Sequence, residues 1–147
     1  MNNLTELYKQ WRGEAPASVE KLAGAGSNRQ YYRFADSDGK TVIGVVGTSR
    51  EEDHAFISLA RHFTLRKLPV PEVLAVSDDE MRYLQTDLGH VSLFDAIKGG
   101  REAGGRYNQR ERQLLLKTIR ELPNIQIRRQ YMGGIHEIRP RALPRRA

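Results

Sequence analysis

The sequence predicts an α+β fold: a five-stranded antiparallel sheet with one long helix, preceded by a short helix. Short segments with strand signals, one of them rich in β-branched residues, lie before and after a longer stretch in which apolar residues recur at helical spacing. The chain has 147 residues, a length that predicts a single domain or part of a larger one. Its 39% hydrophobic and 29% charged residues exclude fibrous and wholly disordered classes.

The N-terminal part is predicted to form a short helix and a three-stranded meander. The helix spans residues 3–12, because apolar side chains recur there at helical spacing: Leu4, Leu7, Tyr8 and Trp11. Strand-forming residues are found over 19–23, 30–35 and 41–46. The turn at 36–39 reads Asp-Ser-Asp-Gly, which accepts the positive φ angles of a hairpin. We therefore expect the second and third strands to be antiparallel.

A long helix and two further strands complete the predicted sheet region. Ser49 and Glu52 form the S-x-x-E pattern of a capping box, which predicts a helix start, and Pro69 blocks its continuation. The buried face should reach about Arg66 and consist of Ala55, Phe56, Leu59, Ala60 and Phe63. Two short strands are expected over 72–77 and 81–85.

From residue 87 onward the pattern becomes helical. Ser92 is suited to cap a short helix ending at Ile97, and the four glycines over 99–105 predict a flexible break. A further helix is expected over 108–122 and should end at Pro123. One of its faces carries an apolar stripe that needs a partner, formed by Leu115, Ile119 and Leu122. We therefore expect this stripe to be exposed and to allow self-association.

Charge is divided unevenly along the chain. The net charge is +6, but residues 1–127 hold 18 Lys and Arg against 17 Asp and Glu. Residues 128–147 hold six arginines and the single acid Glu137, so we predict that they form a basic, disordered tail. Nucleic-acid binding through this tail is the least favoured function, because the rest of the chain is nearly neutral.

Composition also limits the cellular location and the kinds of chemical site that the chain can have. The absence of cysteine excludes disulfides, iron–sulfur sites and thiol nucleophiles. The longest stretch without a charged residue, 41–49, has nine residues, against the ~20 needed to cross a bilayer. The N-terminus shows no secretory pattern. We therefore expect a cytoplasmic protein with no membrane partner.

Five segments together resemble a known enzyme family. They are GAGSNRQYYRF, TVIGVVG, EEDHAFISLARHF, LPVPEVLAV and MRYLQTDLGHVSLFDAI. With the order of the predicted elements, they resemble the phosphotransferase family that includes aminoglycoside phosphotransferases and bacterial sugar kinases. The branch they resemble most contains the N-acetylmuramate and N-acetylglucosamine anomeric kinases. The resemblance covers roughly residues 18–127.

The resemblance implies a division of the chain and a ligand. Residues 1–86 would form a protein-kinase-like N-terminal lobe with its leading helix, and 87–127 a hinge with the first helices of an incomplete C-terminal lobe. ATP is the implied cofactor, bound weakly or vestigially here, with magnesium only in the complete family fold. Full-length relatives would phosphorylate a small sugar-like acceptor.

The resemblance also assigns nucleotide-binding residues, which lie in three segments. They are Gly24, Gly26, Ser27, Asn28 and Arg29 in a phosphate-covering loop, Glu52 at the helix start, and Gln85, Asp87 and Leu88 in the hinge. Phosphoryl transfer needs such positioning and charge stabilisation around the phosphates. Each segment has a plainer alternative: an ordinary glycine-rich hairpin, a helix cap, and a turn former at Asp87.

The sequence departs from the family pattern at two points. The strand over 41–46 has no lysine to pair with a helix glutamate, a feature that the sugar-kinase branch also tends to lack, and Arg29, Arg33 or Lys40 could substitute. The catalytic loop H-x-D-x-x-x-x-N and the metal-binding aspartate are also missing, because the last aspartate is Asp95.

We therefore expect neither a catalytic base nor a metal carboxylate in this chain. The predicted function is that of an incomplete kinase-like phosphotransferase, a truncated or frameshifted product that retains a nucleotide-binding lobe and is inactive alone. The main alternative is a non-catalytic protein-interaction or regulatory module that uses the same lobe.

Overall fold

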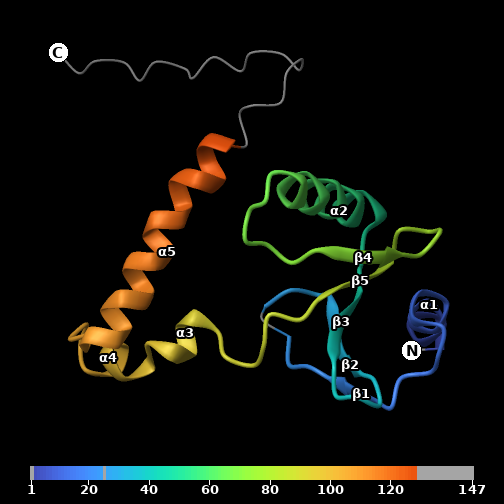
Figure 1. Cartoon of the computed structure of the whole chain (residues 1–147), viewed down its shortest axis with the longest axis horizontal. Coiled ribbons are helices and arrows are strands. Elements are labelled where there is room, and N and C mark those ends of the chain that lie inside the picture. The colour runs from blue at the N-terminus through green and yellow to red at the C-terminus, as the bar shows by residue number, and fades with distance from the viewer. Residues whose placement is uncertain (1, 25, 129–147) are drawn as a thin grey trace.

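The computed structural model describes residues 2–24 and 26–128 and has an α+β fold (Figure 1). Two helices and five strands come first in the chain: α1 Asn2–Arg12, β1 Ser18–Lys21, β2 Gln30–Ala35, β3 Thr41–Val46, α2 Arg50–Leu65, β4 Val73–Val76 and β5 Arg82–Thr86. Three helices follow: α3 Leu93–Ala96, α4 Lys98–Glu102 and α5 Gln109–Arg128. The predicted α+β fold with a five-stranded antiparallel sheet is confirmed.

The sheet has the strand order β1-β2-β3-β5-β4, and every neighbouring pair is antiparallel. Its register places Arg33 of β2 opposite Ile43 of β3, and Ile43 opposite Gln85 of β5. The next row on the same face consists of Tyr31, Val45 and Tyr83. These two rows form the face of the sheet on which the candidate site lies.

Helix α1 packs on the opposite face of the sheet. Its predicted stripe is confirmed for Leu4, Leu7 and Tyr8, which are buried against Phe34, whereas Trp11 is exposed. Tyr8 stacks on Phe34 with 5.2 Å between the ring centroids. The helix lies so close that a Cβ built on Gly44 of β3 would lie 2.9 Å from the side chain of Leu4.

The hairpin between β2 and β3 forms as predicted. Asp36 is buried, and its carboxylate accepts hydrogen bonds from the backbone N–H groups of Asp38 and Lys40, each at 2.9 Å. Arg12 of α1 donates to the same carboxylate at 2.7 Å. Gly39 adopts a φ of +79°, as the turn requires. Asp36 therefore fastens α1 to the sheet as well as closing the turn.

Helix α2 starts where the capping pattern predicted, but its buried face is different. The Ser49 hydroxyl accepts from the Glu52 N–H at 3.5 Å and donates to the Glu51 carboxylate at 3.0 Å. The predicted stripe was wrong for Ala55 and Leu59, which are exposed. The fully buried positions are Asp53, Ile57 and Ala60. The helix is rotated so that an acidic side chain enters the core.

The C-terminal helices correct two further predictions. The glycine-rich segment forms α4, because Gly99 and Gly100 allow close packing: a Cβ on Gly100 would lie 2.1 Å from the Tyr107 ring. Pro123 does not end α5, which continues to Arg128. The short helix capped by Ser92 is confirmed as α3. Figure 1 shows α5 running outside the sheet region, reached through α3 and α4.

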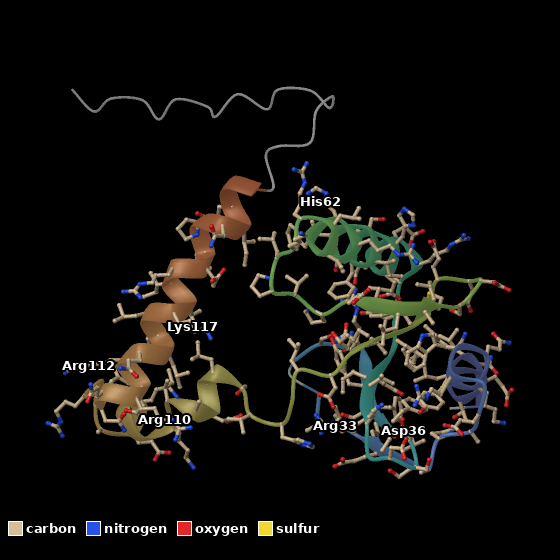
Figure 2. All side chains as sticks on the ribbon, in the orientation of Figure 1. Arg33, Asp36, His62, Arg110, Arg112 and Lys117 are labelled. Atoms are coloured by element: carbon tan, nitrogen blue, oxygen red, sulfur yellow. The ribbon has the colours of Figure 1, made fainter. Side chains whose placement is uncertain are left out.

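The apolar stripe of α5 is exposed over most of its length. Ile119 is 58% exposed and Leu122 is 48% exposed, whereas Leu115 is half-buried and Leu116 is exposed in its place. Lys117 stands on the same stretch of the helix (Figure 2). No helix among the described residues has the length and apolar character needed to span a bilayer. The basic tail was predicted over 128–147; Arg128 is the last residue of α5, and residues 129–147 lie outside the described residues.

Candidate functional site

A cleft of about 250 Å³ lies on the sheet face opposite α1, beside the segment that follows β5. Side chains from β2 and β3 and from the stretch after β1 form one wall: Leu22, Tyr31, Arg33 and Ile43. Pro71 and the segment 85–89 form the other. The sheet brings these segments together because β5 pairs with β3 next to β2.

The cleft combines apolar walls with one buried polar atom that has no partner among the described residues. Leu22, Tyr31 and Ile43 supply flat apolar surface, of the kind that holds an aromatic ring. The Oε1 atom of Gln85 is buried and accepts no hydrogen bond from any described residue. A buried amide oxygen without a donor is energetically costly. The cleft therefore favours a ligand that brings a hydrogen-bond donor to Gln85.

An ion pair fixes the rim of the cleft. The Arg33 guanidinium donates to both carboxylate oxygens of Asp87, at 2.6 and 3.3 Å, and to the Gly89 carbonyl at 3.1 Å. The Asp87 side chain is 4% exposed. The hydrogen bonds from Arg33 are the main cause that lowers the pKa of Asp87 to about 2. Figure 2 shows Arg33 where the chain leaves the sheet towards α3.

The loop between β1 and β2 lies beyond the other end of β2. The Leu22 N–H donates to the Tyr31 carbonyl at 2.9 Å and so keeps the two strands paired up to the loop. Gly24, Gly26, Ser27 and Asn28 are exposed. The Ser27 hydroxyl accepts from the Arg29 N–H at 3.0 Å. This bond turns the backbone back into β2 and sends the Arg29 side chain towards α2.

Arg29 forms an ion pair with Asp53, the buried acid of α2. Its Nη2 lies 3.1 Å from Oδ1 of Asp53, which is completely buried. Neither carboxylate oxygen has a partner with hydrogen-bond geometry among the described residues, so the contact with Arg29 is a charge pair. The guanidinium also lies over the ring of Phe56, 5.4 Å from its centroid.

Burial dominates the electrostatics of this cluster. Desolvation raises the pKa of Asp53, and the charge of Arg29 acts in the opposite direction. Desolvation likewise raises the pKa of Tyr83, whose ring stacks on Phe56 at 5.3 Å. A Cβ on Gly47 would lie 1.4 Å from the Asp53 carboxylate. Only glycine at the end of β3 leaves room for this acid.

The residues that the sequence assigned to nucleotide binding fall in three places. Gln85, Asp87 and Leu88 line the cleft. Arg29 and its loop lie further along the same face, at the start of β2. Glu52 is exposed, and its neighbour Asp53 takes the buried position.

Sequence reasoning missed Asp53 and did not single out the apolar wall of the cleft. The signal for Asp53 was its helical spacing with Ile57 and Ala60, four and seven residues later. Among residues 2–24 and 26–128, no group of three or more His, Asp or Glu side chains is arranged to hold a metal ion. Comparison of the sequence with models of protein families and with curated proteins found no match to either.

Proposed function

We propose that this chain binds an adenine nucleotide in the cleft, as the nucleotide-holding lobe of a kinase-like phosphotransferase of the sugar-kinase type. The observation that carries the proposal is the cleft itself, with apolar walls around the unpartnered amide oxygen of Gln85. A purine base needs flat apolar surface on its faces. The exocyclic amine of adenine supplies the donor that Gln85 lacks.

The size of the cleft supports binding of the base. Ligand pockets for whole drug-sized molecules have volumes of about 300–1,000 Å³, and this cleft is smaller. The sugar and phosphates would therefore extend beyond it. The segment 85–89 forms one wall, and the ion pair between Arg33 and Asp87 keeps that wall in place.

Catalysis by the chain alone is not part of this proposal. Phosphoryl transfer requires a carboxylate base and a metal-binding aspartate, and the sequence has no aspartate after Asp95. The purified 147-residue chain is therefore expected not to transfer the terminal phosphate of ATP to a hexosamine. Transfer from radiolabelled ATP above the rate of a buffer blank would contradict this part of the proposal.

A pair of variants tests the nucleotide site. Titration calorimetry with ADP should show weak, saturable binding, and NMR shifts should concentrate at 26–29 and 85–89. Gln85→Leu should weaken binding about fivefold to tenfold, since one net hydrogen bond is worth about 1 kcal/mol. Gln10→Leu, on the exposed side of α1, is the matched control and should bind as the original chain does. No binding at millimolar ADP would refute the proposal.

An interaction module remains the second candidate, favoured by a separate observation. Leu88, Val91 and Phe94 are 73%, 70% and 62% exposed, all within eight residues after β5. Such an apolar patch is typical of a protein-contact surface. A partner that binds this segment, with no response of the chain to nucleotide, would favour this function over the first.

A further inference from the structure

The sheet region and the helices after it carry opposite net charges. Residues 1–97, which contain the sheet, hold 11 Lys and Arg against 14 Asp and Glu, whereas residues 98–127 hold seven against three. Two of these three acids are engaged, because Glu111 is buried and Glu102 lies 3.7 Å from the Lys98 ammonium. An anionic surface would therefore attract α5 and repel the sheet region.

The cations of α5 and of the segment before it are not neutralised by nearby acids. Four of them are exposed and form no ion pair with any described residue: Arg106, Arg110, Lys117 and Arg120. Arg112 is also exposed, and its guanidinium donates to the Tyr107 carbonyl at 2.9 Å. Figure 2 shows Arg110, Arg112 and Lys117 along α5, outside the sheet region. These side chains are accessible to a large negatively charged partner.

The apolar stripe of α5 lies directly beside these cations. Leu116, Ile119 and Leu122 are each about half exposed and follow one another at intervals of three residues, so they lie along one side of the helix. Arg120 follows Leu116 by four residues, which places it next to the stripe. A helix with a basic polar face and an exposed apolar face is typical of helices that lie in the plane of a membrane surface.

From this arrangement we propose that α5 binds the surface of an anionic lipid bilayer. The helix lies in the plane of the surface, with Leu116, Ile119 and Leu122 among the upper acyl chains and its cations against the charged headgroups. Such binding needs no spanning helix, and the sequence expectation of no membrane partner considered only spanning and secretory segments. None of the residues that line the cleft belongs to α5, so the proposal does not depend on nucleotide binding.

The same side chains disfavour two other occupants of this surface. A nucleic acid would neutralise the cations but would leave the apolar stripe in water. A second copy of α5 would cover the stripe but would bring like charges together at Lys117 and Arg120. An anionic bilayer satisfies both sets of side chains, because its headgroups are charged and its acyl chains are apolar. Without lipid, the stripe remains available for the self-association that the sequence predicts.

Sedimentation of the full chain with lipid vesicles measures this binding. Vesicles of two parts phosphatidylcholine and one part phosphatidylserine should bind the chain at least about ten-fold more tightly than phosphatidylcholine alone. Each Lys or Arg near an anionic surface is expected to contribute about fivefold. Binding should weaken when the ionic strength is raised from about 0.1 M to about 0.5 M, because salt screens the charges. Equal binding to both kinds of vesicle would overturn the proposal.

Two double variants separate the cations of α5 from its apolar stripe. Lys117→Gln with Arg120→Gln should weaken binding to the anionic vesicles about ten-fold or more. Ile119→Gln with Leu122→Gln leaves the charge unchanged and should also weaken binding at least about ten-fold. All four positions are exposed, so far-ultraviolet circular dichroism should show the original helix content in both variants.

A matched control removes the same charge from the sheet region. Lys21→Gln with Arg61→Gln replaces two exposed cations that form no ion pair with any described residue, and this variant should bind the vesicles as the original chain does. An equal loss in this control and in the charge variant of α5 would mean that net charge alone drives binding, and would overturn the proposal.

The absence of cysteine allows a single label to locate the contact. Gln126 is exposed and lies four residues after Leu122, on the side of the stripe. An environment-sensitive fluorophore on Gln126→Cys should shift its emission to shorter wavelength with anionic vesicles. The same label on Ser58→Cys, exposed on α2, should not shift. Vesicle binding with no shift at position 126, or with equal shifts at both positions, would overturn the assignment to α5.

The remaining outcomes identify the other occupants. Failure of the original chain to bind anionic vesicles, together with binding to polyuridylate that Ile119→Gln with Leu122→Gln does not weaken, would assign the cations to a nucleic acid. A stable dimer that binds no vesicles would assign the stripe to a second copy. Either result would overturn the proposal.

Discussion

Arg33 and Asp87 join two parts of the chain that are 54 residues apart in the sequence. The two contacts of Arg33 with the carboxylate are supplemented by its bond to the Gly89 carbonyl and by a 2.9 Å contact with Nδ1 of His90. Both partners are largely shielded from water, which strengthens the pair. The shape of the cleft rim therefore depends on this one arginine.

Replacing Asp87 with asparagine should lower the free energy of unfolding by about 2 kcal/mol at pH 7. The pKa of Asp87 falls from 3.8 to about 2 on folding, so its contribution is complete above pH 4. It is lost as the pH falls from about 4 to about 2. Urea unfolding at pH 7, 5 and 3 should show the difference between the two chains narrowing with acid. The exposed Asp38→Asn is the control, and a pH-independent difference for Asp87→Asn would contradict the assignment.

For single residues, the sequence predicted which segment would contribute to the cleft better than it predicted which side chains would form ion pairs. Gln85, Asp87 and Leu88, which were predicted to form a hinge, do lie together, because all three lie at or just after the end of one strand. The pairing of Arg29 with Asp53 depends on the rotation of α2 about its axis. Apolar residues occur on several sides of that helix, so periodicity alone placed the buried face on Ala55 and Leu59.

Among the elements, α4 and α5 are held together by one buried acid. The Glu111 carboxylate accepts from the N–H groups of Gly100 at 3.0 Å and Asn108 at 2.8 Å. The Asn108 side chain in turn accepts from the Glu111 N–H at 2.9 Å, which completes a capping box. Glu111 therefore starts α5 and fixes α4 against it.

Glu111→Ala should destabilise the chain by about 2 kcal/mol, because two backbone donors lose their acceptor and one of them is buried. Asn108→Ala removes only one cap bond and should cost about 1 kcal/mol. Thermal unfolding followed by far-ultraviolet circular dichroism measures both. Gln113→Ala, at an exposed position two residues after Glu111, should have almost no effect; equal effects of all three would contradict the role of the cap.

The helices and strands were predictable where the local signal was strong, and their ends were predictable only where several signals agreed. Strands β2 and β3 match the prediction residue for residue, because the aromatic residues of β2, the β-branched run of β3 and the Asp-Gly turn between them agree. The glycine-rich segment was taken as a break, since a glycine that permits close packing against Tyr107 looks the same in sequence as one that permits flexibility. Pro123 was given too much weight as a helix terminator.

For the molecule as a whole, α5 presents an apolar stripe to solvent. Leu116, Ile119 and Leu122 are each about half exposed. The N-terminal turn of this helix packs near α3 and α4, and the later turns extend outside the sheet region (Figure 1). Self-association was predicted from the sequence through Leu115, Ile119 and Leu122. It stays a prediction, which the exposure of Ile119 and Leu122 supports.

Sedimentation velocity over a concentration series should show the chain associating reversibly. Ile119→Glu combined with Leu122→Glu should weaken association at least about ten-fold, because burying each such side chain is worth about 1.5–3 kcal/mol. Lys117→Glu, on the same turns of α5, is the control for a change of charge alone. A concentration-independent monomer would refute the prediction.

Three glycines restrict how the sequence can change, because a larger residue does not fit at their positions. At positions 44, 47 and 100 a neighbouring side chain already occupies the place of a Cβ, and the neighbours belong to three different contacts, those of α1, α2 and the α4–α5 corner. Any larger residue at one of these sites would displace the helix that packs there. Related sequences should therefore keep glycine at these three positions, and the residues that face them should be replaced only by smaller ones.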